Sequence, residues 1–159
     1  MTVRFDYEYD IDTVFELLTE PQFLVDRSLA IGELSAECEC EEEDELTMLK
    51  LVREVERDLP SILAKIFDPV QVLDMTETWQ ADGDGWAGHW IIDVRGQPVT
   101  IRGDFDLTPT AGGCCYSVTH SVRAKVLLVG KQVEKYILSQ TVDGATQELQ
   151  YTADYLGQN

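Results

Sequence analysis

The stretch GKQVEKYILSQTVDGATQELQYTADYL, residues 130–156, decides the fold because it predicts one long terminal helix. At 1.5 Å per residue such a helix would be roughly 40 Å long. Gly144 lies in its middle, where glycine costs about 0.5–1 kcal/mol relative to alanine. No proline or cluster of turn residues accompanies this glycine, and apolar residues resume at Ala145 and Leu149. We therefore expect the helix to continue through Gly144, with room left beneath the missing side chain, and to end at Gly157.

Two apolar edges run along this helix when its residues are placed at 100° intervals. One edge holds Leu138, Val142, Ala145, Leu149 and Leu156, and the other holds Val133, Ile137, Gly144, Tyr151 and Tyr155. Between the edges fall Glu134, Thr141, Glu148 and Thr152. Polar residues in such a place can face a partly hydrated cavity. Alternatively, a long curved helix changes its buried face along its length, and these residues then face solvent. Both alternatives stay open for Glu148, whereas we expect Glu134 to lie outside.

The chain before this helix predicts mostly strands. Alternating apolar and polar residues, with turn signals such as ADGDG, RGQP and PTAGG between them, indicate strands at residues 2–9, 33–41, 46–56, 70–80, 86–95, 99–108 and 114–126. Two short helices follow the first strand, one near 13–19 capped by Asp10 or Asp12, and one near 21–29 opened by a capping-box-like Thr19 and ended by Gly32. A third brief helix is expected within 58–68, capped by Asp58.

These elements predict an α+β fold in a single domain over residues 1–159. A sheet with one solvated face must cover its other face, and the terminal helix is large enough to do so. We expect a helix-grip architecture, in which a curved antiparallel sheet of about seven strands wraps around the long C-terminal helix. The two short helices follow strand 1.

The charge balance excludes some partners. Asp and Glu number 30 against 12 Lys and Arg, which gives a net charge of -18. Such a field repels nucleic acid and anionic membrane surfaces, and no stretch reaches the length of a transmembrane span. The first ten residues lack the apolar core of a signal peptide, so we expect a cytoplasmic protein that binds no nucleic acid and does not insert stably into membranes. The dense acidic run at 37–45 is largely the solvated face of one strand.

The four cysteines predict neither a disulfide nor a metal site. Cys38 and Cys40 are separated by one residue, and Cys114 and Cys115 are adjacent. Strand neighbours point to opposite faces, and residues two apart lie near the distance limit for a disulfide. The C-x-C and C-C spacings also differ from the C-x2-C of zinc knuckles. We expect buried thiols, no metal and no cofactor.

Several segments resemble a known superfamily. They are FLVDRSLAIGE (23–33), DLPSILAKIF (58–67), TETW (76–79), VRGQPVTIRGDFDLTP (94–109) and VGKQVEKYILSQ (129–140). With the order of elements, they resemble the START-like superfamily (SRPBCC; lipid-transfer proteins and polyketide cyclases), and within it a bacterial branch known only as a domain of unknown function. The resemblance covers essentially the whole chain. It implies a ligand cavity between sheet and helix, and it brings no catalytic motif.

Nine residues are candidates for lining that cavity. On the inward-facing parity of the strands or on the inner side of the helix we place Arg53, Glu77, Trp79, Trp90, Tyr116, His120, Thr141, Gly144 and Glu148. An arginine, a histidine and one or two glutamates in an apolar pocket suit the polar end of a ligand, or proton transfer. The alternative is a mutually paired structural set, since buried charges must be paired.

Three functions are compatible with these residues. The favoured hypothesis is non-enzymatic binding or transport of a small hydrophobic molecule, lipid-like or polyketide-like. The second is a cyclase- or hydrolase-type enzyme that uses His120 with Arg53 and a glutamate. The third is a non-catalytic interaction module whose cavity is filled by its own side chains. A cavity volume below roughly 300 Å³ would argue against a drug-sized ligand. The oligomeric state does not follow from the sequence.

Overall fold

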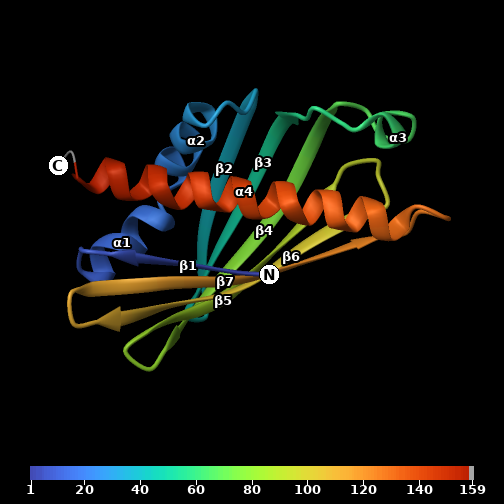
Figure 1. Cartoon of the computed structure of the whole chain (residues 1–159). Helices are drawn as coiled ribbons and strands as arrows, with labels where there is room; N and C mark the ends of the chain where they lie inside the picture. Colours follow the sequence, from blue (N-terminus) through green and yellow to red (C-terminus); the bar gives the residue numbers. More distant parts are fainter. Residues whose placement is uncertain (158–159) are drawn as a thin grey trace.

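The computed structural model describes residues 1–157, in which a curved antiparallel sheet holds one long helix, α4, against its concave face (Figure 1). The elements in chain order are β1 (Thr2–Tyr7), α1 (Ile11–Leu18), α2 (Pro21–Ala30), β2 (Ser35–Glu43), β3 (Leu46–Glu56), α3 (Ser61–Ala64), β4 (Val70–Asp82), β5 (Gly85–Val94), β6 (Val99–Thr110), β7 (Gly113–Ala124) and α4 (Gly130–Gly157). The predicted α+β helix-grip class is confirmed.

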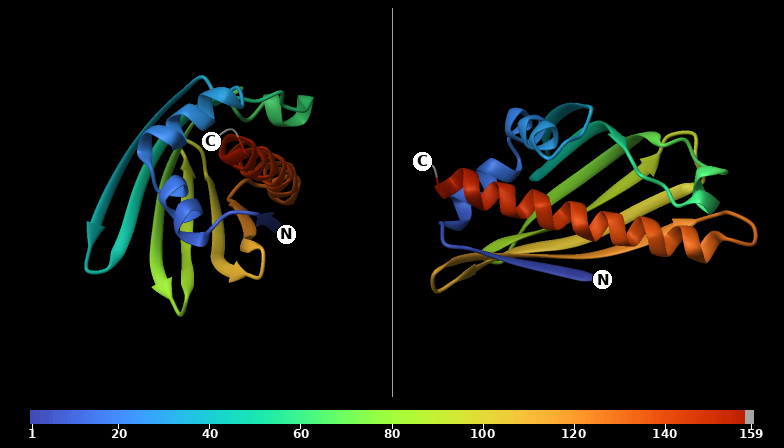
Figure 2. Two further views of the ribbon diagram at one scale, coloured as in Figure 1. Left: turned by 90° about the vertical axis from the view of Figure 1, so that its left-hand side faces the viewer. Right: turned by 45° about the horizontal axis from the view of Figure 1, so that its top comes forward.

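The seven strands form one sheet in the order β1-β7-β6-β5-β4-β3-β2. All neighbouring strands are antiparallel, and β2 to β7 follow one another as a meander of hairpins. The first strand joins the far edge by pairing with β7, where Thr2 lies opposite Thr119. The segment containing α1 and α2 therefore crosses from one edge of the sheet to the other, and it closes the end near the C-terminal half of α4 (Figure 2).

The short helices begin at different residues from some of those expected. The side chain of Asp10 caps α1, as predicted, by accepting the Asp12 backbone N–H at 3.1 Å. At α2 the cap is Glu20, which accepts the Gln22 and Phe23 backbone N–H groups. The prediction for Thr19 is wrong, because its hydroxyl donates back to the α1 carbonyl of residue 15 at 2.8 Å. A proline at the first helical position suits α2, because that position needs no N–H.

The third helix is shorter than expected and is not capped by Asp58. It covers one turn, and its N-cap is Pro60, which offers no side-chain hydrogen bond. Asp58 instead presents its backbone carbonyl to the Tyr136 hydroxyl, at 2.9 Å. A proline cannot donate a backbone hydrogen bond and holds an extended residue before it, which delays the start of the helix.

The alternation of buried and exposed residues along the strands matches the prediction. In β6 the inward residues Val99, Ile101, Gly103, Phe105 and Leu107 are all buried, and the residues between them are exposed. The acidic residues of β2 are exposed. All four cysteines are free thiols, and Cys114 and Cys115 are buried. The prediction of a buried thiol is wrong for Cys40, which is exposed because it lies near the open end of edge strand β2.

Helix α4 continues through Gly144 without a break, as predicted. Its buried residues are Val133, Ile137, Leu149, Thr152 and Leu156. Val133 and Ile137 belong to one of the two expected apolar edges, and Leu149 and Leu156 belong to the other. Thr152 is a polar residue that lies between the edges. Gly157 is still helical and is the last residue described. Within residues 1–157, no helix combines the length and the apolar composition needed to cross a membrane.

Candidate functional site

A cavity of about 350 Å³ lies between the concave face of the sheet and α4. Its walls come from α1, α2, strands β3 to β7 and the middle of α4. Exposed lining residues such as Glu56, Asp58 and Asp143 mark its rim. All nine candidate residues lie on its wall: Arg53, Glu77, Trp79, Trp90, Tyr116, His120, Thr141, Gly144 and Glu148. Their part in ligand binding stays a prediction.

Two glycines shape the space. Gly103 on β6 lies directly opposite Trp90 on β5, and an added Cβ at Gly103 would overlap the Trp90 indole ring. The glycine therefore leaves room for the Trp90 indole, which lines the cavity. At Gly144 on α4 an added Cβ would have no neighbour within 4 Å, so this glycine borders open space. The observation matches the expectation that Gly144 leaves room beneath the helix.

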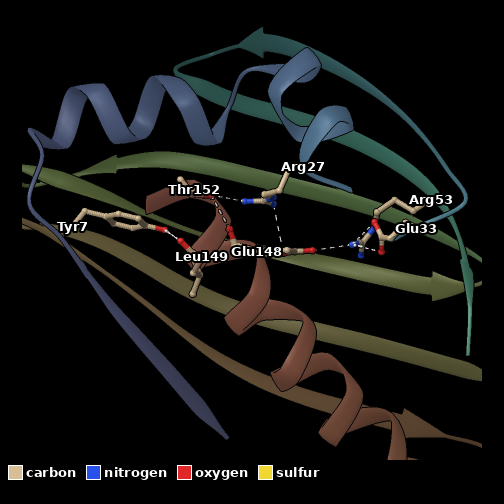
Figure 3. A network of polar contacts seen from close by, with 7 residues as sticks. All are labelled: Tyr7, Arg27, Glu33, Arg53, Glu148, Leu149 and Thr152. Atoms are coloured by element: carbon tan, nitrogen blue, oxygen red, sulfur yellow. Dashed lines mark hydrogen bonds and ion pairs between the residues drawn. The ribbon is translucent and has the colours of Figure 1, made fainter. Parts of the chain in front are cut away.

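Four charged residues on the cavity wall form a charge network, Arg27–Glu148–Arg53–Glu33 (Figure 3). Arg53 Nη1 lies 3.0 Å from Glu148 Oε1 and 3.3 Å from Glu33 Oε2. Arg27 Nη2 lies 3.4 Å from Glu148 Oε2. Glu148 therefore joins α4 to both α2 and β3, and the two positive charges are matched by two negative charges.

Hydrogen bonds fix α4 beside this charge network (Figure 3). Arg27 Nη1 donates to the Thr152 hydroxyl at 3.3 Å, and that hydroxyl donates to the Glu148 carbonyl at 2.8 Å. Tyr7 on β1 donates its hydroxyl to the Leu149 carbonyl at 3.3 Å. The C-terminal half of α4 is thus tied to α2, β1 and β3 by polar contacts. Such polar networks help to specify the position of a packed helix.

Burial changes the acidity of Glu33 in this network. Loss of solvent raises the pKa of the Glu33 carboxyl group, and the positive charge of Arg53 opposes the rise. Its side chain remains 13% exposed and keeps the ion pair to Arg53. The negative charge of Glu33 is therefore stabilised mainly by its contact with Arg53 and less by water.

Glu77 on β4 differs from these glutamates because it has no charged partner. The residue is 8% exposed, and its carboxyl group forms no ion pair with any arginine among residues 1–157. The Trp79 indole N–H approaches the carboxyl group, but it completes no hydrogen bond. Burial raises the pKa of Glu77 to about 7, with the Trp79 N–H and the charge of Arg27 opposing the rise. Glu77 can thus gain or lose a proton near neutral pH.

His120 on β7 is also without a partner. It is 3% exposed, and neither ring nitrogen makes a hydrogen bond within the described chain. Burial lowers the pKa of His120, with the nearby Met1 backbone opposing the fall, so the ring is neutral at neutral pH. Its ring lies 5.5 Å from that of Trp90. Across residues 1–157, no three His, Cys, Asp or Glu side chains cluster closely enough to hold a metal ion.

The structure settles the two alternatives for the helix glutamates. Glu148 faces the cavity and takes part in the charge network. Glu134 is not on the cavity wall, and its Oε1 accepts the Ala124 backbone N–H at the end of β7, at 3.1 Å. Glu134 therefore lies outside the cavity, as expected.

Arg27 and Glu33 were not predicted from the sequence. Arg27 follows Phe23 by four residues and Leu24 by three, and both of these are buried on the inner side of α2. That spacing places the arginine on the same helix face, which is the signal that could have found it. Glu33 lies in the turn after α2, where no periodicity points to a side-chain direction.

A comparison with protein families matches residues 2–156 to the family described as "Protein of unknown function (DUF2505)". The chain belongs to this family. The match covers β1 to α4, so the DUF2505 domain and the cavity described above coincide. A comparison with curated proteins gives no match.

Solved structures share the fold of this DUF2505 chain at low identity. An uncharacterised protein from Rhizobium leguminosarum superposes with a TM-score of 0.62 at 10% identity, over 100% of this chain and 94% of the other. A protein from Chromobacterium violaceum gives 0.54 at 10% identity, over 98% and 94%. A conserved protein from Geobacillus kaustophilus gives 0.50 at 15% identity, over 96% and 93%. At these identities the likeness concerns the fold alone.

Proposed function

We propose that this DUF2505 protein binds or carries a small hydrophobic molecule in the cavity between its sheet and α4. The observation that carries the proposal is the cavity itself, because a volume of about 350 Å³ lies within the range of small-molecule sites. Its wall combines apolar strand residues such as Leu51, Ile92 and Ile101 with a few polar groups. This composition is typical of sites that bury an apolar body and orient it by one end.

The START-like resemblance supports the same proposal. Proteins of that superfamily place their ligands between a curved sheet and a terminal helix, and the present cavity has this location. Fold alone does not fix function, so the argument depends on the cavity and its residues. The cavity exceeds the volume of roughly 300 Å³ expected of a drug-sized site, which favours a ligand over an interaction module filled by its own side chains.

The enzymatic alternative has less support. A cyclase or hydrolase using His120 with Arg53 and a glutamate would need these groups to share a reacting atom. Within residues 1–157 no hydrogen bond joins His120 to either partner, and Arg53 is held by Glu33 and Glu148. We therefore favour binding or transport over catalysis.

A Gly144→Leu variant tests the proposal. An added Cβ at Gly144 has no neighbour within 4 Å and Gly144 lines the cavity, so we expect the leucine side chain to occupy part of the cavity volume. We expect loss of nonanol binding, measured through the fluorescence of the tryptophans that line the cavity. Thermal stability should be unchanged or slightly higher, because leucine is a better helix former than glycine.

Gly112→Leu is the matched control. Gly112 lies in the exposed turn between β6 and β7 and also has no neighbour near an added Cβ. This variant should bind nonanol as the wild type does. Equal binding by wild type and Gly144→Leu would place the binding site elsewhere and refute the proposal.

A further inference from the structure

The cavity wall carries more acidic than basic groups. Among residues 1–157, six carboxyl groups line it, from Glu33, Glu56, Asp58, Glu77, Asp143 and Glu148. Three guanidinium groups oppose them, from Arg27, Arg53 and Arg57. This imbalance matches the net charge of -18 for the whole chain. A cleft lined by one sign of charge raises the local concentration of the opposite ion, so the electrostatic field favours entry of cations.

Pairing within the wall leaves one carboxyl group unmatched in the interior. The two arginines of the charge network, Arg27 and Arg53, are already matched by Glu148 and Glu33. Glu77 is buried, whereas Glu33 and Glu148 are only partly buried, and it has no cation within ion-pair distance among residues 1–157. A buried carboxylate without a partner is costly, and a bound cation would remove that cost.

Aromatic rings surround this carboxyl group. Glu77 pairs directly across the β4–β5 ladder with Trp90, and Trp79 lies two residues along the same face. The negative charge of Glu77 also helps raise the pKa of Tyr116 on β7, which places that ring nearby. The faces of tryptophan and tyrosine rings attract ammonium groups. A carboxylate beside such rings is therefore suited to bind an organic cation.

We propose that the cavity selects hydrophobic molecules that carry an ammonium group, with Glu77 as the counter-ion of that group. The inference deepens the proposed function and rests on it. The apolar residues of β3, β5 and β6 hold the hydrocarbon part, and the ammonium group lies between Glu77 and the rings of Trp79 and Trp90. An anionic ligand is disfavoured, because among residues 1–157 six carboxyl groups on the cavity wall outnumber three guanidinium groups.

This arrangement makes amine binding depend on pH. The titratable and charged groups around Glu77 are Arg27 on α2, Cys38 on β2, Arg53 on β3, Tyr116 and His120 on β7, and Glu148 on α4. Burial raises the pKa of Cys38 to about 11 and the pKa of Tyr116 still further from neutrality, while that of His120 is lowered. An alkylammonium group stays charged up to about pH 10. Glu77, with a pKa of about 7, changes its ionisation between about pH 6 and pH 8, whereas Glu33, whose pKa burial also raises, is held by its ion pair to Arg53.

The test compares three probes of one chain length: nonylamine, nonanol and nonanoate. Binding is measured by isothermal titration calorimetry at about pH 8 and again at about pH 6. We expect nonylamine to bind roughly tenfold more tightly than nonanol at the higher pH, a difference of about 1.4 kcal/mol, and nonanoate to bind most weakly. The preference for the amine should shrink at the lower pH.

Glu77→Gln removes the counter-ion and keeps the shape of the side chain. This variant should bind nonylamine and nonanol equally, so the preference of the wild type for the amine should be lost. Glu39→Gln is the matched control. It makes the same chemical change at an exposed residue of β2 that does not line the cavity. It should keep the preference for the amine.

Each outcome bears on a different part of the account. If nonanol binds to the wild type as tightly as nonylamine at both pH values, the ammonium inference is wrong while the proposed function stands. If Glu77→Gln keeps the preference, Glu77 is not the counter-ion. If none of the three probes binds, the proposed function and the inference fail together. Nonspecific adsorption on the acidic surface is recognised by its loss at high salt and by its persistence in Gly144→Leu.

Discussion

Two sets of polar residues share the wall of one cavity and differ in whether they are paired. The charge network of Arg27, Glu33, Arg53 and Glu148 connects α2, β3 and α4 through contacts of 3.0 to 3.4 Å. Glu77, on the sheet side of the same cavity, is 8% exposed and has no charged partner among residues 1–157.

On the proposed function, the difference separates a structural role from a binding role. Paired charges hold the helix against the sheet, and removing one of them leaves its partner without compensation. An unpaired buried group lowers stability, and buried groups with shifted pKa values are typical of functional sites. We therefore propose that the charge network supports the cavity and that Glu77 and His120 meet its ligand.

The largest effect is expected when the charge network is broken. Arg53→Met removes the cation that contacts both Glu33 and Glu148, while Arg53 itself is 7% exposed. Leaving two partly buried carboxylates without this partner should cost about 3–5 kcal/mol of unfolding free energy. Urea denaturation followed by circular dichroism measures the loss.

Arg95→Met is the control for this change. Arg95 pairs with Asp74 at 2.6 Å on the surface, where the two side chains are 58% and 38% exposed. Exposed pairs contribute little, so its denaturation midpoint should match that of the wild type. If Arg53→Met were as mild as Arg95→Met, the charge network would not hold the helix.

A somewhat smaller effect is expected from Glu77 as pH changes. Its pKa is about 7 in the folded chain and 4.5 in the absence of structure. Below the lower value the carboxyl group is protonated in both states, and its contribution to stability is intact. As pH rises towards 7 the unfolded chain loses the proton first, so the folded state loses about 3 kcal/mol relative to it.

Glu77→Gln isolates this effect. The variant should gain stability relative to the wild type as pH rises from about 5 to about 8, by about 3 kcal/mol. Thermal or urea unfolding at several pH values measures the difference between the two proteins. A carboxylate paired with an arginine would show the opposite trend, so a variant that loses relative stability with rising pH would place Glu77 among the paired residues.

The sequence predicts much of the fold because its signals are local. Alternation in β6 and β7 places Phe105 and His120 on the inner face, and the apolar residues on both sides of Gly144 predict an unbroken α4. The errors occur where a residue expected to cap a helix forms a different hydrogen bond. Thr19 closes α1 and does not cap α2, and Asp58 gives its carbonyl to Tyr136 on α4.

The site is predicted only in part for a related reason. Strand parity identifies Glu77 and Arg53 as inward, but it does not say which of them is paired. Pairing depends on Arg27 and Glu33, which come from α2 and the turn after it, and on Glu148 from the far end of the chain. These contacts link residues that lie up to 121 positions apart, so they follow from the tertiary fold and not from spacing along the sequence.

The most direct test of the central claim is native mass spectrometry of freshly purified wild-type protein beside Gly144→Leu. If the unpaired side of the cavity serves a ligand, the wild type should carry a bound small molecule that dissociates on activation, and solvent extraction should recover a hydrophobic amine. Gly144→Leu should give the mass of the bare chain. A bare wild-type chain from several expression hosts, with no uptake of added nonylamine or nonanol, would contradict the claim.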